Sequence, residues 1–187
     1  MFSPWARSDG NAFSVKSTKY NSNYEHDRES DFFTLSFTFE QLQQKDVNAC
    51  VEAILSTLKG QLAAMHEDKE TIKRMIYGPQ VMTIVAKKEG RVTGLISGTL
   101  PIQPRIMFLT VTDRQSAEQG LGATLIDQFV QAAKKQQPKA PFILHNEFAE
   151  NYNAIGLFSM KGFTITGFIR DSITNRDVVF MKRPLLT

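Results

Sequence analysis

Residues 106–123 read IMFLTVTDRQSAEQGLGA, an apolar run that passes through a polar loop into a Gly-x-Gly pair. Beyond the glycines, apolar residues recur at the spacing of one face of a helix. The stretch therefore predicts a strand over Ile106–Val111 and, after the loop, a long helix that ends near Pro138.

The two glycines, Gly120 and Gly122, stand where the predicted helix begins, and the first backbone N–H groups of a helix have no partner in a preceding turn. Such an end attracts phosphate oxygens, and glycine lets the backbone come close to a bulky anion. Tight packing of a strand on a helix would need the same glycines, so the spacing alone leaves both interpretations open. Two common nucleotide loops are excluded, because no lysine follows Gly122 and Leu125 stands where the dinucleotide fingerprint has a third glycine.

The remaining pattern predicts one central sheet. Strands are predicted over residues 31–39, 81–86, 92–100, 142–147, 163–169 and 177–182, and further helices over residues 47–58, 62–76 and 153–161. The strand–helix–strand crossover in the middle implies parallel neighbours, whereas the flanking hairpins imply antiparallel pairing. The predicted fold class is mixed α/β, or α+β.

Residues 1–31 differ from the rest, since Val15 is their only branched aliphatic residue among Ser, Asn, Asp, Lys and scattered aromatics. Such a segment cannot bury enough surface to offset its ordering entropy. We expect a polar arm before a domain over residues 32–187. The arm is either flexible or docked through its aromatic side chains on the domain or on a partner.

Composition restricts the class of protein. The chain has 187 residues, 42% of them hydrophobic, and a formal net charge of +3. One cysteine, Cys50, cannot form an internal disulfide and indicates a reducing compartment. Three scattered histidines argue against a metal site, the weak charge argues against nucleic-acid binding, and no apolar run approaches the roughly 20 residues of a membrane span. We expect a soluble, cytoplasmic protein.

Two motifs resemble the GNAT N-acetyltransferase superfamily. The family's Arg/Gln-x-x-Gly-x-Gly/Ala loop corresponds to AEQGLG at residues 117–122. The family's Asn-x-x-Ala-x-x-Leu-Tyr-x-x-x-Gly-Phe corresponds to NYNAIGLFSMKGF at residues 151–163. The order of predicted elements agrees with the family from about residue 32 to 183.

The resemblance implies a V-shaped sheet in which two parallel strands separate and acetyl-CoA lies between them. The strand before the loop would pair with the pantetheine arm, the loop's N–H groups would bind the pyrophosphate, and Asn151 would reach the pantetheine or its sulfur end. The cofactor-binding residues implied are Leu109, Thr110, Val111, Ala117, Glu118, Gln119, Gly120, Leu121, Gly122, Ala123, Asn151 and Phe158.

Departures from the family pattern affect these expectations. Ala117 replaces the usual Arg or Gln, so one side-chain contact to the diphosphate is lost, and we expect Glu118 to face solvent. The spacing from Val111 to Gly120 is one residue longer than usual, which leaves the pantetheine register open by one position. Phe158 stands where many members have a tyrosine that protonates the leaving thiolate, and phenylalanine has no proton to give.

Candidate catalytic residues end the strand that follows the long helix. In Leu144-His145-Asn146-Glu147 the alternation of a strand puts His145 and Glu147 on one face, at the strand end where open α/β sheets bind ligands. Some GNAT members have Leu-Tyr-Thr-Asp at this place. By this analogy we expect Glu147 to act as base or amine-binding carboxylate and His145 as base or relay. The alternative is a solvated loop entry with His145 bonded to the backbone.

The expected reaction is transfer of an acetyl group from acetyl-CoA to a primary amine of a small molecule, peptide or protein. Direct attack in a ternary complex is expected, because the sequence shows no activated Cys or Ser for an acyl-enzyme. One alternative is a non-catalytic acyl-CoA-binding or regulatory module, and another is an interaction protein that keeps the fold without the cofactor. Whether the chain forms a homodimer is left open.

Overall fold

The computed structural model describes residues 37–57, 68–170 and 175–185. Contacts divide the chain after Ser36, and the unit from Phe37 onward contains everything described below. The predicted arm over residues 1–31, and most of the strand predicted over residues 31–39, lie outside the described residues.

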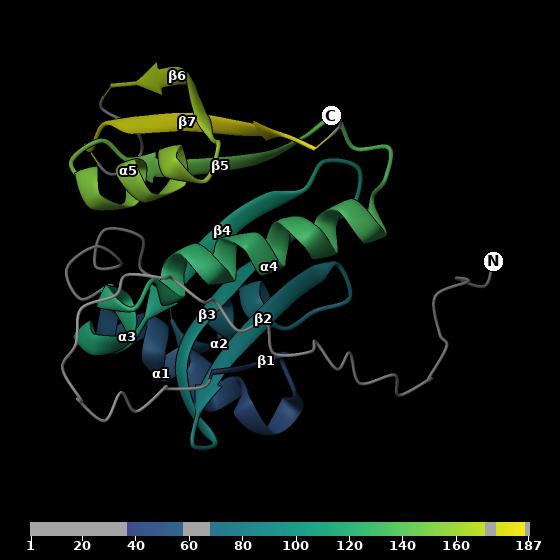
Figure 1. The fold of residues 1–187 in the computed structure, drawn as a ribbon, viewed down its shortest axis with the longest axis vertical. Helices are drawn as coiled ribbons and strands as arrows, with labels where there is room; N and C mark the ends of the chain where they lie inside the picture. Colours follow the sequence, from purple (N-terminus) through teal and green to yellow (C-terminus); the bar gives the residue numbers. More distant parts are fainter. Residues whose placement is uncertain (1–36, 58–67, 171–174, 186–187) are drawn as a thin grey trace, which may run out of the picture. The chain divides into compact units, whose positions relative to one another are not determined.

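One mixed sheet forms the centre of this unit (Figure 1). Its strands lie in the order β1-β2-β3-β4-β5-β7-β6, and β4 and β5 are parallel while the other neighbouring pairs are antiparallel. Their bounds are β1 Thr38–Gln41, β2 Val81–Lys88, β3 Arg91–Thr99, β4 Arg105–Val111, β5 Phe142–Phe148, β6 Thr164–Ile169 and β7 Val178–Pro184. The predicted mixed α/β class is confirmed.

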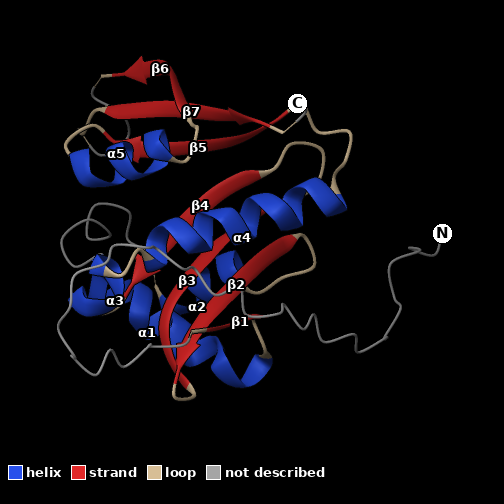
Figure 2. Ribbon diagram, in the orientation of Figure 1, coloured by secondary structure: helices blue, strands red, loops and turns tan. Residues whose placement is uncertain are grey.

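Helices cover both faces of the sheet (Figure 2). They are the 3-10 helix η1 Gln44–Asp46 and the α-helices α1 Val47–Thr57, α2 Lys69–Ile76, α3 Arg114–Glu118, α4 Leu121–Gln136 and α5 Tyr152–Met160. One apolar cluster includes Phe129 of α4 and Phe158 of α5, and a second includes Ile54 of α1 and Ile72 of α2. Each cluster packs on the apolar side chains of one sheet face.

Two helix predictions need correction. The helix predicted over residues 62–76 does not run through Asp68, whose backbone is extended and whose carboxylate accepts from the Thr71 N–H at 2.7 Å. An aspartate at this position is a helix N-cap, so α2 begins at Lys69; residues 58–67 are not described. Helix α3 was not predicted, because its five residues show no apolar periodicity.

A bulge bends β4 beside β5. Ser97 of β3 pairs with Phe108 while Gly98 pairs with Ile106, so Met107 is an extra residue in β4. On its other side β4 pairs with β5 at only two positions, the last being Ile106 with His145. From Met107 onward the facing edges of β4 and β5 pair with no strand among the described residues. This gap between the two strand ends, called the split below, confirms the predicted V-shaped sheet.

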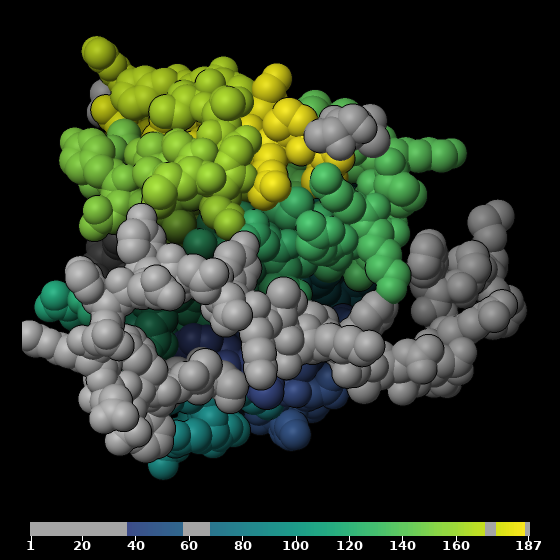
Figure 3. Space-filling model, viewed as in Figure 1, coloured from purple at the N-terminus to yellow at the C-terminus, as the bar shows by residue number. Residues whose placement is uncertain are grey.

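The far end of the sheet is strand β6, which among the described strands pairs with β7 alone. In the space-filling view the yellow-green atoms of α5 and β6 form a broad surface (Figure 3). Large apolar side chains are exposed there, namely Tyr152, Met160, Ile165, Phe168 and Ile169. In the described part of the chain, no helix is long and apolar enough to cross a membrane.

Candidate active site

The polar loop between β4 and α4 has a conformation fixed by side-chain hydrogen bonds and a glycine turn. Asp113 caps α3, since its carboxylate accepts from the Ser116 N–H and from the Ser116 hydroxyl, both at 2.8 Å. These bonds, opposed by partial burial, lower the pKa of the Asp113 carboxyl. Gly120 then begins α4 with a φ of 78°, a left-handed conformation that glycine adopts without strain. The loop thus turns the N-terminus of α4 toward the end of β4.

Not all of the loop N–H groups are available to a ligand. Those of Ala117, Gln119 and Gly120 donate to carbonyl oxygens within the loop. The first backbone bond of α4 runs from the Thr124 N–H to the Gly120 carbonyl. The first-turn groups of α4 are therefore the N–H groups of Leu121, Gly122 and Ala123, which have no preceding helical turn to bind. Anion binding stays a prediction, and these three N–H groups are the candidates for it.

Gly122 lets α4 pack closely on its neighbours. A Cβ on Gly122 would lie 3.1 Å from the Leu157 side chain of α5, and about 4 Å from those of Leu109 and Val111. The missing side chain lets α4 approach α5 and β4 closely. Gly120 thus supplies the turn and Gly122 the close approach, which agrees with the packing interpretation, while phosphate binding stays a prediction.

Glu118 is exposed, as expected, and its carboxylate binds the Arg114 guanidinium at 2.6 Å. Ala117 is exposed as well. Asn151, the first residue of the second motif, is the N-cap of α5, and its side-chain oxygen accepts from the Ala154 N–H at 3.4 Å. Its amide NH₂ is not used in this cap.

His145 is buried, with 5% of its surface exposed. Its ring stacks on Phe158 with centroids 3.7 Å apart, and Nδ1 lies 3.4 Å from the Ile106 carbonyl oxygen. The expected alternative of a backbone partner is therefore found for Nδ1. Nε2 has no hydrogen-bond partner and lies 3.6 Å from Oε2 of Glu147.

Glu147 lies on the same face of β5 as His145, and the structure brings the two side chains together. Its Oε1 accepts from the Phe148 N–H at 2.9 Å, which leaves Oε2 toward the imidazole. With 16% of its side chain exposed, Glu147 is the member of the pair that solvent or a substrate reaches. Phe158 is 1% exposed and belongs to the apolar core, so it positions the imidazole.

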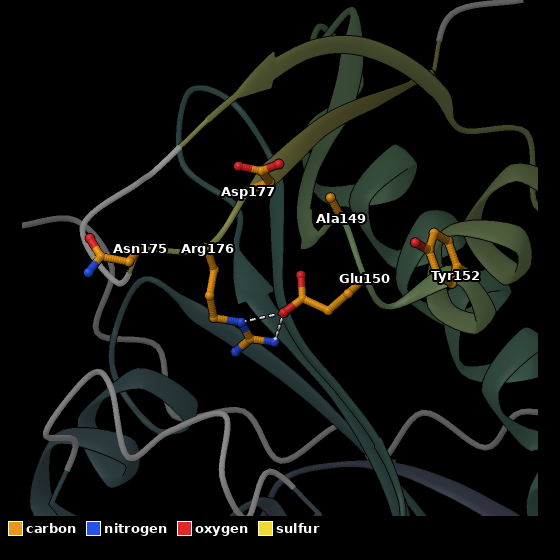
Figure 4. A pocket seen from close by; sticks show the side chains of 6 residues that line it. All are labelled: Ala149, Glu150, Tyr152, Asn175, Arg176 and Asp177. Atoms are coloured by element: carbon orange, nitrogen blue, oxygen red, sulfur yellow. Dashed lines mark hydrogen bonds and ion pairs between the residues drawn. The ribbon is translucent and has the colours of Figure 1, made fainter.

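A hollow of about 440 Å³ lies where β5 ends and β7 begins (Figure 4). Its lining consists of Ala149, Glu150, Tyr152, Asn175, Arg176 and Asp177. Arg176 donates to the Glu150 carboxylate and stacks over the Phe148 ring, with its Cζ 3.5 Å from the centroid. The sequence analysis missed this pair, because residues 26 apart on two loops give no periodic signal. None of the predicted catalytic residues lines the hollow.

In the described residues, no group of three or more His, Cys, Asp or Glu side chains is arranged to hold a metal ion. The candidate site combines the split between β4 and β5, the N-terminus of α4 and the His145–Glu147 pair.

Comparison with known proteins addresses the fold. No protein-family model and no curated protein sequence matches the chain. The ribosomal-protein-S18-alanine N-acetyltransferase from Escherichia coli superposes with a TM-score of 0.68 at 16% identity, covering 81% of this chain and 96% of that one. This chain has the GNAT fold.

Two further structures agree. The aminoglycoside 6'-acetyltransferase type Ii gives a TM-score of 0.68 at 11% identity, over 80% of this chain and 98% of that one. A GNAT-family acetyltransferase from Streptococcus pneumoniae gives 0.64 at 15% identity, over 80% and 99%. Because these identities are low, the likeness establishes the GNAT fold of this chain, and its chemistry has to be argued from the site.

Proposed function

We propose that this protein is a GNAT-type N-acetyltransferase that moves the acetyl group of acetyl-CoA to a primary amine. The observation that carries the proposal is the split between β4 and β5, which closes at Ile106 and His145 and opens beside the N-terminus of α4. A peptide-like pantetheine arm can pair with an open strand edge, and a diphosphate suits a helix N-terminus.

The donor groups match such a ligand. Backbone groups of β4 from Leu109 to Val111 would bind the pantetheine amides, and the N–H groups of Leu121 to Ala123 would bind the pyrophosphate. Ala117 adds no side-chain contact, so we expect the diphosphate to be held by backbone N–H groups. The exposed Glu118 carboxylate is paired with Arg114, which reduces its repulsion of phosphate.

The acceptor amine must lose one proton as its nitrogen bonds to the acetyl carbon. Glu147 is the carboxylate beside His145 with part of its side chain exposed, and we assign it the role of base or amine-binding group. The tetrahedral oxygen needs a hydrogen-bond donor, which a free N–H of β4 can supply. Direct attack in a ternary complex fits, because Cys50, the one cysteine of the chain, is buried in the cluster of α1 and α2.

A non-catalytic acyl-CoA-binding module is the second candidate, favoured by Phe158 and Ala117, which remove an acid and a phosphate contact of the family pattern. It predicts tight binding of acetyl-CoA with no transfer to any amine. The cytoplasmic location of the protein stays a prediction. A homodimer also stays a prediction, to which the exposed apolar side chains of β6 lend support.

A thermal-shift titration with acetyl-CoA, with ATP as control, tests the proposal. Ligand at 100 times its dissociation constant stabilises a protein by about 2.7 kcal/mol, which for this size is roughly 5–10 °C. We expect a saturable shift with acetyl-CoA and none with ATP. A shift followed by CoA release with a panel of amines supports the enzyme, and a shift without release supports the binding module. No shift at millimolar acetyl-CoA overturns both.

A further inference from the structure

Nε2 of His145 is a buried polar atom without a partner. The described residues contain only three such side-chain atoms, the others being Oγ1 of Thr110 and Nη1 of Arg183. Buried polar groups in folded proteins are nearly always hydrogen-bonded, so an unpartnered one calls for an explanation, such as a catalytic role.

The imidazole stands at the closed end of the split. Ile106 and His145 form the last paired position of β4 and β5, and beyond them the two strands separate. A group that enters the split from the N-terminus of α4 and follows β4 reaches its end at this histidine. For acetyl-CoA, the end that arrives there is the thioester, with its sulfur and its acetyl group.

The surroundings of the ring hold it in one orientation. Phe158 of α5 lies parallel to it, Phe163 meets its edge with centroids 6.4 Å apart, and the Ile106 carbonyl of β4 lies beside Nδ1. Met181 of β7 is its cross-strand neighbour. The charged group beside the imidazole is the carboxylate of Glu147, whose Oε2 lies 3.6 Å from Nε2.

We propose that His145 protonates the departing thiolate of coenzyme A and that Glu147 resupplies the proton. This assignment rests on the proposed function and settles which member of the pair acts at which bond. The amine nitrogen bonds to the acetyl carbon and gives one proton to Oε2 of Glu147. Because Nδ1 faces the Ile106 carbonyl, which can only accept, the acid is the imidazolium form of His145, in which Nε2 also carries a proton. The carbon–sulfur bond breaks with its electron pair on sulfur, and sulfur takes the proton from Nε2, which leaves the imidazole neutral. The Glu147 proton then passes to Nε2, so both groups return to their starting state.

The geometry explains the division of roles. Oε1 of Glu147 is held by the Phe148 N–H, so the carboxylate can take up a proton on Oε2, which faces both the imidazole and the partly open side of the pair. Phe158 has no hydroxyl to compete for Nε2, and its ring stacks on the face of the imidazole, so it leaves Nε2 without a partner. The pair together contains the acid that Phe158 does not supply.

The first test is nitrogen NMR of the histidine side chains in ¹⁵N-labelled full-length protein. Free coenzyme A and desulfo-coenzyme A, which differ only at the sulfur, are the probes. We expect coenzyme A to shift the Nε2 signal of His145 while desulfo-coenzyme A binds without that shift. His145→Asn identifies the signal, and Ser159→Ala, an exposed neighbour of Phe158, is the matched control that keeps the response.

The second test measures proton transfer through the far-ultraviolet absorbance of the bound thiolate. Because the proposed transfer is reversible, an imidazole that gives its proton to sulfur also takes one from it. The thiol of bound coenzyme A should therefore ionise at a pH below the ordinary thiol pKa of about 8.5. His145→Asn should abolish this change, and Glu147→Gln, which keeps the histidine if the first variant fails to fold, should alter it.

The outcomes separate the two proposals. If both probes bind and act equally on the histidine signal, and the bound thiol ionises at its ordinary pH, the acid role of His145 is overturned while coenzyme binding stands. If neither probe binds, the proposed function itself is overturned, and the acid role with it.

Discussion

Gly98 is the residue on which the bulge of β4 depends. A Cβ at this position would lie 2.1 Å from the Arg105 carbonyl oxygen and 2.7 Å from the ring of Phe129. Backbone and a core aromatic ring cannot both give way, so we expect Gly98→Ala to lower the free energy of unfolding by about 3 kcal/mol. The loss is measured by urea unfolding with circular dichroism as the signal.

Gly156 provides the matched control for this glycine. It lies in the exposed part of α5, and a Cβ there meets nothing within 4 Å. Gly156→Ala should stabilise the protein by about 0.5–1 kcal/mol, because alanine loses less backbone entropy in a helix. Equal effects of the two substitutions would show that the close approach at Gly98 is relaxed in solution.

Single residues also mark where sequence reasoning succeeded and where it stopped. Alternation along β5 put His145 and Glu147 on one face, and the structure brings them to 3.6 Å. The burial of His145 against Phe158 could not be predicted, because it depends on how α5 packs on the sheet. The position of Met107 in the bulge was likewise hidden, since an extra residue in an apolar strand leaves the composition unchanged.

At the scale of elements, α3 connects β4 to α4 and holds the loop in place. Asp113→Ala removes the cap of this five-residue helix and should lower the free energy of unfolding by about 1 kcal/mol. Because the N–H groups of α4 follow directly, we also expect weaker binding of acetyl-CoA, measured by isothermal titration calorimetry.

Asp68→Ala is the control for this element, since the Asp68 carboxylate caps α2 in the same way and α2 packs in the other apolar cluster, with α1. It should lower stability and leave the affinity for acetyl-CoA unchanged. If both variants lose affinity alike, the loss reflects general loosening of the fold and the loop has no special role in binding.

Long apolar elements were predictable because their period survives in the sequence. The strands of the central hairpin and the helix α4 lie close to their predicted positions. The short capped helix α3 and the start of α2 were not, since a few polar residues take their conformation from one side-chain bond. The split could be expected from the family resemblance, while its closing position at Ile106 and His145 came from the observed register.

At the scale of the whole molecule, a charged cluster attaches the first described elements to the core. The ammonium group of Lys87 in β2 lies 2.6 Å from the Glu40 carboxylate of β1 and 2.7 Å from that of Asp46 in η1. Burial disfavours the charged lysine, but the two carboxylates outweigh it and raise the pKa of Lys87. Nearby, burial foremost and Asp46 next raise the pKa of the Cys50 thiol from 9.0 to about 12.

These shifts predict how stability changes in alkali. A lysine whose pKa is raised on folding stabilises fully below its ordinary value of 10.5, and this contribution is lost as pH rises through the folded value. The Cys50 thiol stays protonated in the folded chain while the unfolded chain ionises above pH 9.0, so stability starts to fall there. Cys50→Ala should remove the earlier part of the decline, as measured by urea unfolding between neutral pH and alkali.

Lys87→Met should leave two carboxylates facing each other without a cation. It should lower the free energy of unfolding by about 3 kcal/mol at neutral pH. The variant should also lose the part of the alkaline fall in stability that begins near pH 10.5. The difference between its free energy of unfolding and that of the wild type should therefore shrink as pH rises. Glu40→Gln and Asp46→Asn added to Lys87→Met should recover most of the loss, because no charge is then left unpaired. A constant difference between Lys87→Met and the wild type across this range would mean that the side chain acts through packing alone.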